Sequence, residues 1–183
     1  MNSQGRKIWL VTGERGVGKT RFSTRLVDKA RQLNLDVAGV LSSPVFSGNT
    51  KTGIQIENLR TGEHRLLALQ RVEDSKATST RRWTFDDEVL KWGNTILAEC
   101  LPCQLLVVDE LGTLEFERGM GLLNGITALK SGRFMSAVVV IRPELLELAK
   151  LRFETTNVVD IPSDLNEVLE NDLITNILSN FKH

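Results

Sequence analysis

A run of glycine and polar residues directly after a short apolar segment constrains this chain more than any other feature. Residues 13–20 read G-E-R-G-V-G-K-T and match the pattern G-x-x-x-x-G-K-[S/T] at every fixed position. The apolar segment Ile8–Val11 predicts a strand before the run. A helix after it is predicted by the spacing of Phe22, Leu26, Val27, Ala30 and Leu33. The run therefore predicts a loop that joins a strand to a helix.

A loop of this composition is suited to holding phosphate groups. Its glycines allow several backbone N–H groups to point into one concave surface. The N-terminus of the following helix adds partial positive charge at the same place. The Lys19 ammonium can reach the β- and γ-phosphates, and the Thr20 hydroxyl can bind Mg²⁺. We predict that a nucleoside triphosphate is bound by Gly13, Glu14, Arg15, Gly16, Val17, Gly18, Lys19 and Thr20.

Length and charge narrow the range of partners. A chain of 183 residues suits one α/β domain, residues 1–183, with a sizeable core. Its 23 Lys and Arg balance 23 Asp and Glu, so no net charge attracts nucleic acid or an anionic membrane. No apolar stretch approaches the ~20 residues that span a bilayer, and the first strand leaves no room for a signal peptide. We expect a soluble, cytoplasmic protein.

The only cysteines are Cys100 and Cys103, in the sequence C-L-P-C. A redox C-x-x-C motif follows a strand and opens a helix, where the helix dipole lowers a thiol pKa. Here the order is reversed, because Cys100 ends a predicted helix and Cys103 starts a predicted strand. A zinc site needs two further ligands, for which the spacing of His64 and His183 offers no support. We interpret both cysteines as structural thiols.

Apolar runs and helical patterns alternate along most of the chain, which predicts a parallel sheet covered by helices. The predicted strands are Lys7–Val11, Asp36–Leu41, Gln104–Val108, Met135–Ile141 and Asn157–Ile161. The predicted helices are Lys19–Leu33, Asp86–Cys100, roughly Arg118–Lys130 and Glu144–Arg152, with a last helix that begins near Ser163 and is capped by Ser163 or Asp164.

Two segments depart from this alternation. Residues Gly53–Leu69 alternate with period two around Arg60–Glu63, which predicts a hairpin. Ser75–Thr80 is polar and typical of a loop. Neither segment is long enough for a second domain. We expect a small antiparallel insertion at one edge of the sheet, followed by a loop.

A pair of acids follows the buried strand Leu105–Val108. Open α/β sheets place ligand chemistry at the carboxyl ends of their strands, where Asp109 is expected. Asp109 can hold Mg²⁺ together with Thr20. Glu110 can orient or deprotonate a water molecule that attacks the γ-phosphate. Because phosphoryl transfer depends mostly on positioning and charge, Glu110 and Lys19 are the predicted catalytic residues.

Simpler structural roles are also possible for this pair and for the residues that follow it. A strand-terminal Asp-Glu pair can also serve as a helix cap or a solvent-facing turn. Gly112 is expected to allow a close backbone approach or a positive φ. Glu115 can support Mg²⁺ or a nearby arginine, or it can cap the following helix.

Several arginines are candidates for stabilising the transferred phosphoryl group. Arg142 follows the strand Met135–Ile141 and is expected at the same sheet edge as Asp109, near the nucleotide. Arg15 lies within the phosphate loop, and Arg81 and Arg82 lie in a segment that can close over it. Each can equally be an ordinary surface arginine. Trp83 and Phe85 can stack on a base or pack against the next helix.

With these motifs in view, the chain resembles the P-loop nucleoside-triphosphatases of the thermophile type, a family that includes the human cancer-related nucleoside-triphosphatase. The segments that carry the resemblance appear in the family's order up to about Phe153. They are G-E-R-G-V-G-K-T at Gly13–Thr20, G-V-L-S-S-P-V at Gly39–Val45, G-I-Q-I-E-N-L-R-T-G-E at Gly53–Glu63 and V-V-D-E-L-G-T-L-E at Val107–Glu115.

The resemblance implies a RecA-like core with Met135–Ile141 between the phosphate-loop strand and the Asp109 strand. It also implies slow, Mg²⁺-dependent hydrolysis of several nucleoside triphosphates, ATP and GTP among them, to diphosphate and phosphate. Two departures are visible. Thr113 stands where many members carry lysine, and an acidic stretch, D-I-P-S-D-L-N at Asp160–Asn166, stands where members commonly carry an Asn-Arg pair.

Two other functions fit the phosphate loop. A nucleotide or small-metabolite kinase would use the same site with an acceptor pocket and an arginine-bearing lid, for which Ser75–Arg82 is the candidate. A regulatory module would use bound nucleotide as a conformational switch. No N-K-x-D segment that reads guanine is present, which speaks against a conventional GTPase switch. The base preference, the acceptor and the protein partners are not indicated by the sequence.

Overall fold

In the computed structural model, residues 6–70 and 83–181 are described. The strands are β1 (Lys7–Thr12), β2 (Val37–Ser47), β3 (Thr50–Asn58), β4 (His64–Gln70), β5 (Trp83–Phe85), β6 (Cys103–Leu111), β7 (Phe134–Ile141) and β8 (Val158–Asp160). The helices are α1 (Lys19–Gln32), α2 (Asp87–Glu99), α3 (Thr113–Glu117), α4 (Leu123–Ser131), α5 (Leu146–Phe153) and α6 (Glu167–Leu178), with short 3₁₀ turns at Pro143–Leu145 and Ser179–Phe181.

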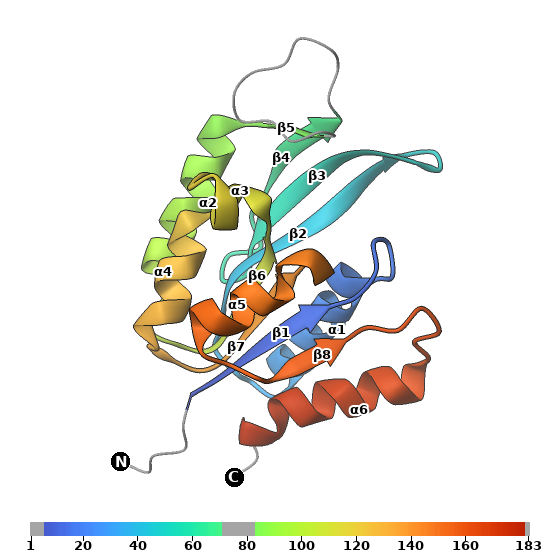
Figure 1. Cartoon of the computed structure of the whole chain (residues 1–183), viewed down its shortest axis with the longest axis vertical. Helices are drawn as coiled ribbons and strands as arrows, with labels where there is room; N and C mark the ends of the chain where they lie inside the picture. The colour runs from blue at the N-terminus through green and yellow to red at the C-terminus, as the bar shows by residue number, and fades with distance from the viewer. Residues whose placement is uncertain (1–5, 71–82, 182–183) are drawn as a thin grey trace.

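The strands form one eight-stranded sheet in the order β5-β4-β3-β2-β6-β7-β1-β8 (Figure 1). Strands β2, β6, β7, β1 and β8 run parallel, whereas β3, β4 and β5 are antiparallel and occupy one edge. The expected mostly parallel sheet with an antiparallel insertion is confirmed. The expectation that β7 lies between the phosphate-loop strand and the Asp109 strand is confirmed as well, because β7 pairs with both β1 and β6.

Helices cover both faces of the sheet, because successive residues of the central strands point to opposite sides. One face buries Leu106 and Val108 of β6 together with residues of α2, α4 and α5. The other buries Leu105 and Val107 together with residues of α1 and α6. The parallel strands are therefore buried on both sides, and their carboxyl ends are the part of the sheet left for chemistry.

Strand β2 is longer than expected and reaches past its parallel neighbour. Its pairing with β6 ends at Val40 opposite Val108, but β2 continues to Ser47 while paired with β3. Beyond Val40 one edge of β2 lacks a strand partner, so Pro44 is tolerated there. The β2–β3 hairpin therefore extends beyond the carboxyl ends of the parallel strands (Figure 1).

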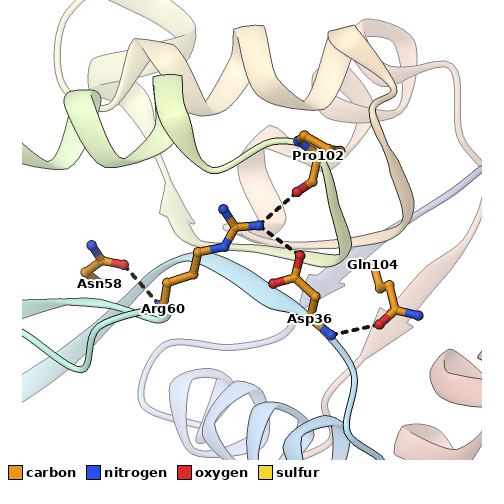
Figure 2. Close-up of polar contacts among 5 residues, drawn as sticks. All are labelled: Asp36, Asn58, Arg60, Pro102 and Gln104. Atoms are coloured by element: carbon orange, nitrogen blue, oxygen red, sulfur yellow. Dashed lines mark hydrogen bonds and ion pairs between the residues drawn. The ribbon is translucent and has the colours of Figure 1, made fainter.

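The opposite end of the insertion is fixed to the base of the sheet by Arg60, in the turn between β3 and β4 (Figure 2). The Arg60 Nη2 group donates to Asp36 Oδ2 at 2.9 Å and to the Pro102 carbonyl at 2.8 Å. Its backbone N–H donates to Asn58 Oδ1 at 3.0 Å, and the Asp36 N–H donates to Gln104 Oε1 at 2.8 Å. Asp36 and Pro102 precede β2 and β6. The hairpin insertion is thus held at the amino ends of the strands.

Two predicted helix boundaries are wrong. The helix expected over roughly Arg118–Lys130 begins only at Leu123, as α4, because Gly119 and Gly121 adopt positive φ angles of 61° and 79° between it and the short α3. The last helix starts at Glu167 rather than near Ser163. Its cap is Asn166, whose side chain accepts the Leu169 N–H at 3.0 Å, so neither Ser163 nor Asp164 caps it.

The two cysteines have the structural role expected of them. Cys100 caps the C-terminal end of α2 and Cys103 opens β6. Both are unpaired, with 3% and 8% of their surfaces exposed. Burial raises the pKa of both thiols, for Cys103 to about 12, so neither is a reactive thiolate at neutral pH. Within the described residues, no helix is both long and apolar enough to span a bilayer.

The closest approach of β2 to β6 depends on Gly39, which has a φ of 111°. A Cβ atom at this position would lie 2.0 Å from the Val107 carbonyl oxygen. We expect Gly39→Ala to lower the free energy of unfolding by roughly 3 kcal/mol or more, because it combines backbone strain with a backbone clash. Urea denaturation of the purified protein measures this loss.

Gly48, in the turn between β2 and β3, provides the matched control. It also has a positive φ, of 57°, but a Cβ there would meet no atom within 4 Å. Gly48→Ala should cost about 1–2 kcal/mol, the backbone penalty alone. Equal losses in the two variants would contradict the importance of the β2–β6 approach.

Candidate functional site

The loop between β1 and α1 has the backbone form that its glycines predict. Gly13, Gly16 and Gly18 have φ angles of 138°, 80° and 104°, a region that other residues rarely adopt. At Gly13 a Cβ would also lie 2.6 Å from the Ile161 carbonyl oxygen, so a side chain is excluded there. The loop is thus built on glycine conformations at each fixed glycine of the motif.

The start of α1 lacks a side-chain cap. Gly18 is the N-cap residue, and within the described residues no side chain makes a capping hydrogen bond to the N–H groups of the first turn. The Lys19 ammonium turns back and donates to the carbonyl oxygens of Gly13 at 2.7 Å and Glu14 at 2.9 Å. An uncapped helix N-terminus beside an ammonium group provides N–H donors and positive charge for an anion.

Asp109 lies near the end of β6 and is 1% exposed. Burial, followed by the neighbouring charge of Glu110, raises the pKa of its carboxyl group to about 8. Thr20, Lys19 and Lys51 oppose this rise, which places the carboxyl group beside the phosphate loop. No hydrogen bond of ordinary geometry reaches either oxygen from the described part of the chain, including from the nearby Thr20 hydroxyl. Both carboxylate oxygens of Asp109 are therefore buried without a hydrogen-bond partner among the described residues.

These features fit a divalent cation. A buried pair of carboxylate oxygens without donors, next to a threonine hydroxyl, is the type of oxygen set that Mg²⁺ accepts, with water and nucleotide phosphates supplying its other ligands. Within residues 6–70 and 83–181, no three His, Cys, Asp or Glu side chains gather as a metal site of their own. Thr20 and Asp109 are thus the two protein groups suited to a metal that arrives with nucleotide.

Glu110 follows Asp109 and is paired with Arg142, which comes directly after β7. The Arg142 Nε group donates to Glu110 Oε1 at 2.6 Å, and the side chains are 43% and 31% exposed. The expected meeting of the two strand ends is therefore present, with Glu110 as the partner of Arg142. Among the described residues no protein donor reaches Glu110 Oε2, which leaves that oxygen for a water molecule.

Glu115 has a structural role. It is 6% exposed, and its two oxygens accept the N–H groups of Gly112 and Leu122, each at 2.8 Å. Of the alternatives open at this residue, the geometry favours capping of α3 over contact with a metal or an arginine. Gly112, whose φ of −128° is ordinary, offers its N–H to this carboxylate and does not need glycine for a positive φ.

Lys51, in β3, lies near these charged residues, although no sequence motif indicates it. Burial lowers the pKa of its ammonium group, although much of the side chain is exposed, and the charges of Glu110, Arg15, Asp109 and Arg142 all act on it. Arg15 is thereby placed on the same side as the acids. The hairpin prediction started at Gly53 and so left Lys51 outside any motif.

The aromatic candidates before α2 pack rather than stack on a base. Trp83 and Phe85 form β5, with Trp83 7% exposed and Phe85 packed against the core. The Lys51 Nζ atom lies 5.1 Å from the centre of the Trp83 ring. Arg81, Arg82 and the loop Ser75–Thr80 lie outside the described residues, so their predicted role as a lid stays a prediction.

The fold and this sheet edge together define a class, the P-loop proteins that bind nucleoside triphosphates. The family model described as NTPase matches residues 8–170. The chain belongs to this family of nucleoside-triphosphatase enzymes.

Individual relatives agree with the family match. The nucleoside-triphosphatase THEP1 of Methanocaldococcus jannaschii is 29% identical over 108 residues, which is 58% of this chain and 62% of that protein. The match thus spans less than two thirds of that relative. The THEP1 of Caldivirga maquilingensis is 26% identical over 130 residues, 71% of this chain and 73% of the relative.

Solved structures show the same fold at low identity. A human cancer-related nucleoside triphosphatase superposes with a TM-score of 0.69 at 20% identity, covering 96% of this chain and 98% of that one. THEP1 from Aquifex aeolicus superposes with a TM-score of 0.66 at 19% identity, covering 96% and 99%.

The raised pKa of Asp109 predicts how stability depends on pH without metal or nucleotide. The folded state keeps the Asp109 proton up to about pH 8, whereas an unfolded aspartate loses it near pH 3.8. The folded state therefore binds more protons between these values, and this group makes the protein less stable as pH rises.

Asp109→Asn removes the charge and should raise the melting temperature by roughly 5 °C or more at pH 8.5, and by clearly less at pH 5, where only the first part of the cost above pH 3.8 is present. Calorimetric scans with a chelator present measure the difference. A difference that stays constant from pH 5 to pH 8.5 would contradict the burial of an ionisable Asp109.

Proposed function

We propose that this chain hydrolyses nucleoside triphosphates, including ATP and GTP, to nucleoside diphosphate and phosphate in the presence of Mg²⁺, in the cytoplasm. The observation that carries the proposal is the meeting of Lys19 and Thr20 with Asp109 and Glu110 at one sheet edge. The family match supports the reaction type. The balanced charge of the chain supports a small-molecule substrate rather than nucleic acid or a membrane.

In this proposal the loop residues Gly13–Thr20 hold the phosphates through backbone N–H groups. Lys19 leaves the Gly13 and Glu14 carbonyl oxygens and transfers its donors to the phosphate oxygens. Thr20 and Asp109 would hold an Mg²⁺ ion, which would neutralise charge on the phosphates. Asp109 would give up its proton to act as a ligand, because a carboxyl group must be ionised to bind a cation.

Glu110 directs the chemical step. Its carboxylate accepts a hydrogen bond from an attacking water molecule and orients it toward the γ-phosphorus. The water oxygen forms a bond to phosphorus as the bond to the β,γ-bridging oxygen breaks, and the diphosphate leaves with that electron pair. The water proton passes to Glu110 or to the released phosphate. The Arg142 bond to Oε1 keeps the other oxygen in place for the water.

Replacement of Glu110 by glutamine tests this role, because the amide keeps the shape but is not a base. Glu110→Gln should lower kcat for phosphate release by about 10²-fold or more and leave nucleotide affinity near that of the parent. Phosphate release without any added acceptor also separates hydrolysis from kinase activity, and negligible release with tight triphosphate binding would instead indicate a switch module.

Two controls accompany this variant. Glu117→Gln makes the same change at an exposed residue of α3 and should leave kcat unchanged. Lys19→Ala should weaken triphosphate binding. Unchanged turnover in Glu110→Gln would remove Glu110 from the mechanism.

The Glu110–Arg142 contact predicts how two substitutions combine. If Arg142 acts by holding Glu110, Arg142→Gln should lower kcat in the parent but have little further effect once Glu110 is glutamine. We expect the double variant to lie within about twofold of Glu110→Gln in single-turnover phosphate release. Losses that multiply would show that Arg142 contacts the phosphates independently of Glu110.

A further inference from the structure

The β2–β3 hairpin brings a second ammonium group to the candidate site from outside the phosphate loop. Past the pair Val40–Val108, β2 continues to Ser47, and Lys51 pairs with Phe46 next to the hairpin turn. Because β2 is parallel to β6, this extension lies on the side of the sheet where β6 presents Asp109 and Glu110. The topology thus places Lys51 beyond the strand ends.

Side-chain packing holds Lys51 there. Its Nζ atom lies 5.1 Å from the centre of the Trp83 ring, and Trp83 is 7% exposed in the adjoining part of the sheet. An ammonium over an indole is a favourable contact that restrains the long side chain. The charges of Arg15, Asp109, Glu110 and Arg142 all act on this ammonium, so it belongs to the same group of charges.

Within the described residues Lys51 forms no ion pair and no hydrogen bond through its ammonium, although two arginines act on it unfavourably. Glu110, the acid whose charge acts most strongly on Lys51, is already paired with Arg142. An anionic ligand at this position would therefore give Lys51 the ion-pair partner that it lacks among the described residues.

We propose that Lys51 binds the terminal phosphate of the nucleoside triphosphate, so that the hairpin contributes to the choice of triphosphate over diphosphate. This inference rests on the proposed function, because it assumes that the polyphosphate lies on the loop Gly13–Thr20. Lys19 grips the phosphates from the loop side, and Lys51 approaches from the hairpin, near the two acids. The contact forms only when a terminal phosphate is present.

Binding of a non-hydrolysable triphosphate analogue and of the diphosphate, measured by calorimetry, tests the proposal. Lys51→Met keeps the length and apolar stem but removes the charge. We expect its Kd for the triphosphate analogue to rise about 10-fold or more, as for loss of a charged hydrogen bond, and its Kd for the diphosphate to change less than about threefold. Lys51→Arg should keep most of the preference.

Arg65 offers a matched control on the neighbouring strand β4. Its guanidinium lies 4.3 Å from the centre of the Trp92 ring and pairs with Glu63, so it too is a cation held over a tryptophan. Its ion pair is with Glu63, outside the candidate site. Arg65→Met should leave both Kd values unchanged. Circular dichroism melts compare the stability of the two variants, and Lys51→Gln replaces Lys51→Met if the latter does not fold.

The outcomes separate this inference from the proposed function. Unchanged affinities in Lys51→Met, or equal weakening for triphosphate and diphosphate, would overturn the role of Lys51 even if the parent hydrolyses nucleotide. A selective loss of triphosphate affinity in a parent that releases no phosphate would support Lys51 and reject hydrolysis. A parent that binds no triphosphate would overturn both.

Discussion

The hydrogen-bonded alignment of β1, β7 and β6 is the constraint on which the rest of the structure depends. Leu10, Val139 and Val108 lie side by side in the register of these strands. Since parallel strands end at a common edge, the phosphate loop, Arg142 and the Asp109–Glu110 pair emerge together. Residues far apart in sequence are thereby assembled without any long-range side-chain recognition. The packing of helices on both faces then stabilises the strands that carry them.

Three ionisable groups at this edge have no opposite charge bonded to them within the described residues. Asp109 is buried without a hydrogen-bond donor, Lys19 is bonded to carbonyl oxygens of its own loop, and Lys51 forms no ion pair although acids and arginines both act on it. Each arrangement costs folding free energy that a fully satisfied interior would avoid. In the proposed function, a polyphosphate with its cation would provide the negative charge for the lysines and the positive charge for Asp109. The site is thus destabilised in the free protein in the manner expected of a functional centre.

The sequence predicts most of the parallel half of this molecule because its signals are local. A glycine motif between an apolar run and a helical pattern identifies the loop at Gly13–Thr20, and the strand that ends at Asp109 is a continuous apolar run. The order of β7 between β1 and β6 came from the family resemblance, not from a local pattern. Gly119 and Gly121 indicate that no single helix runs through that segment, because both adopt positive φ.

The antiparallel half was harder to predict, and it contains Lys51, the residue near the site that no sequence motif indicates. Ser42, Ser43 and Pro44 are typical of a strand end, but a strand that has lost one neighbour tolerates them. The predicted strand ended at Leu41 and so left out the extension of β2 to Ser47. Without that extension, nothing in the sequence indicated that Lys51 lies near the site. The pairing of Arg142 with Glu110 was likewise invisible, since it depends on side-chain directions at two strand ends. Local patterns therefore predict the groups that hold a phosphate tail, whereas the groups that approach it from the hairpin depend on tertiary geometry.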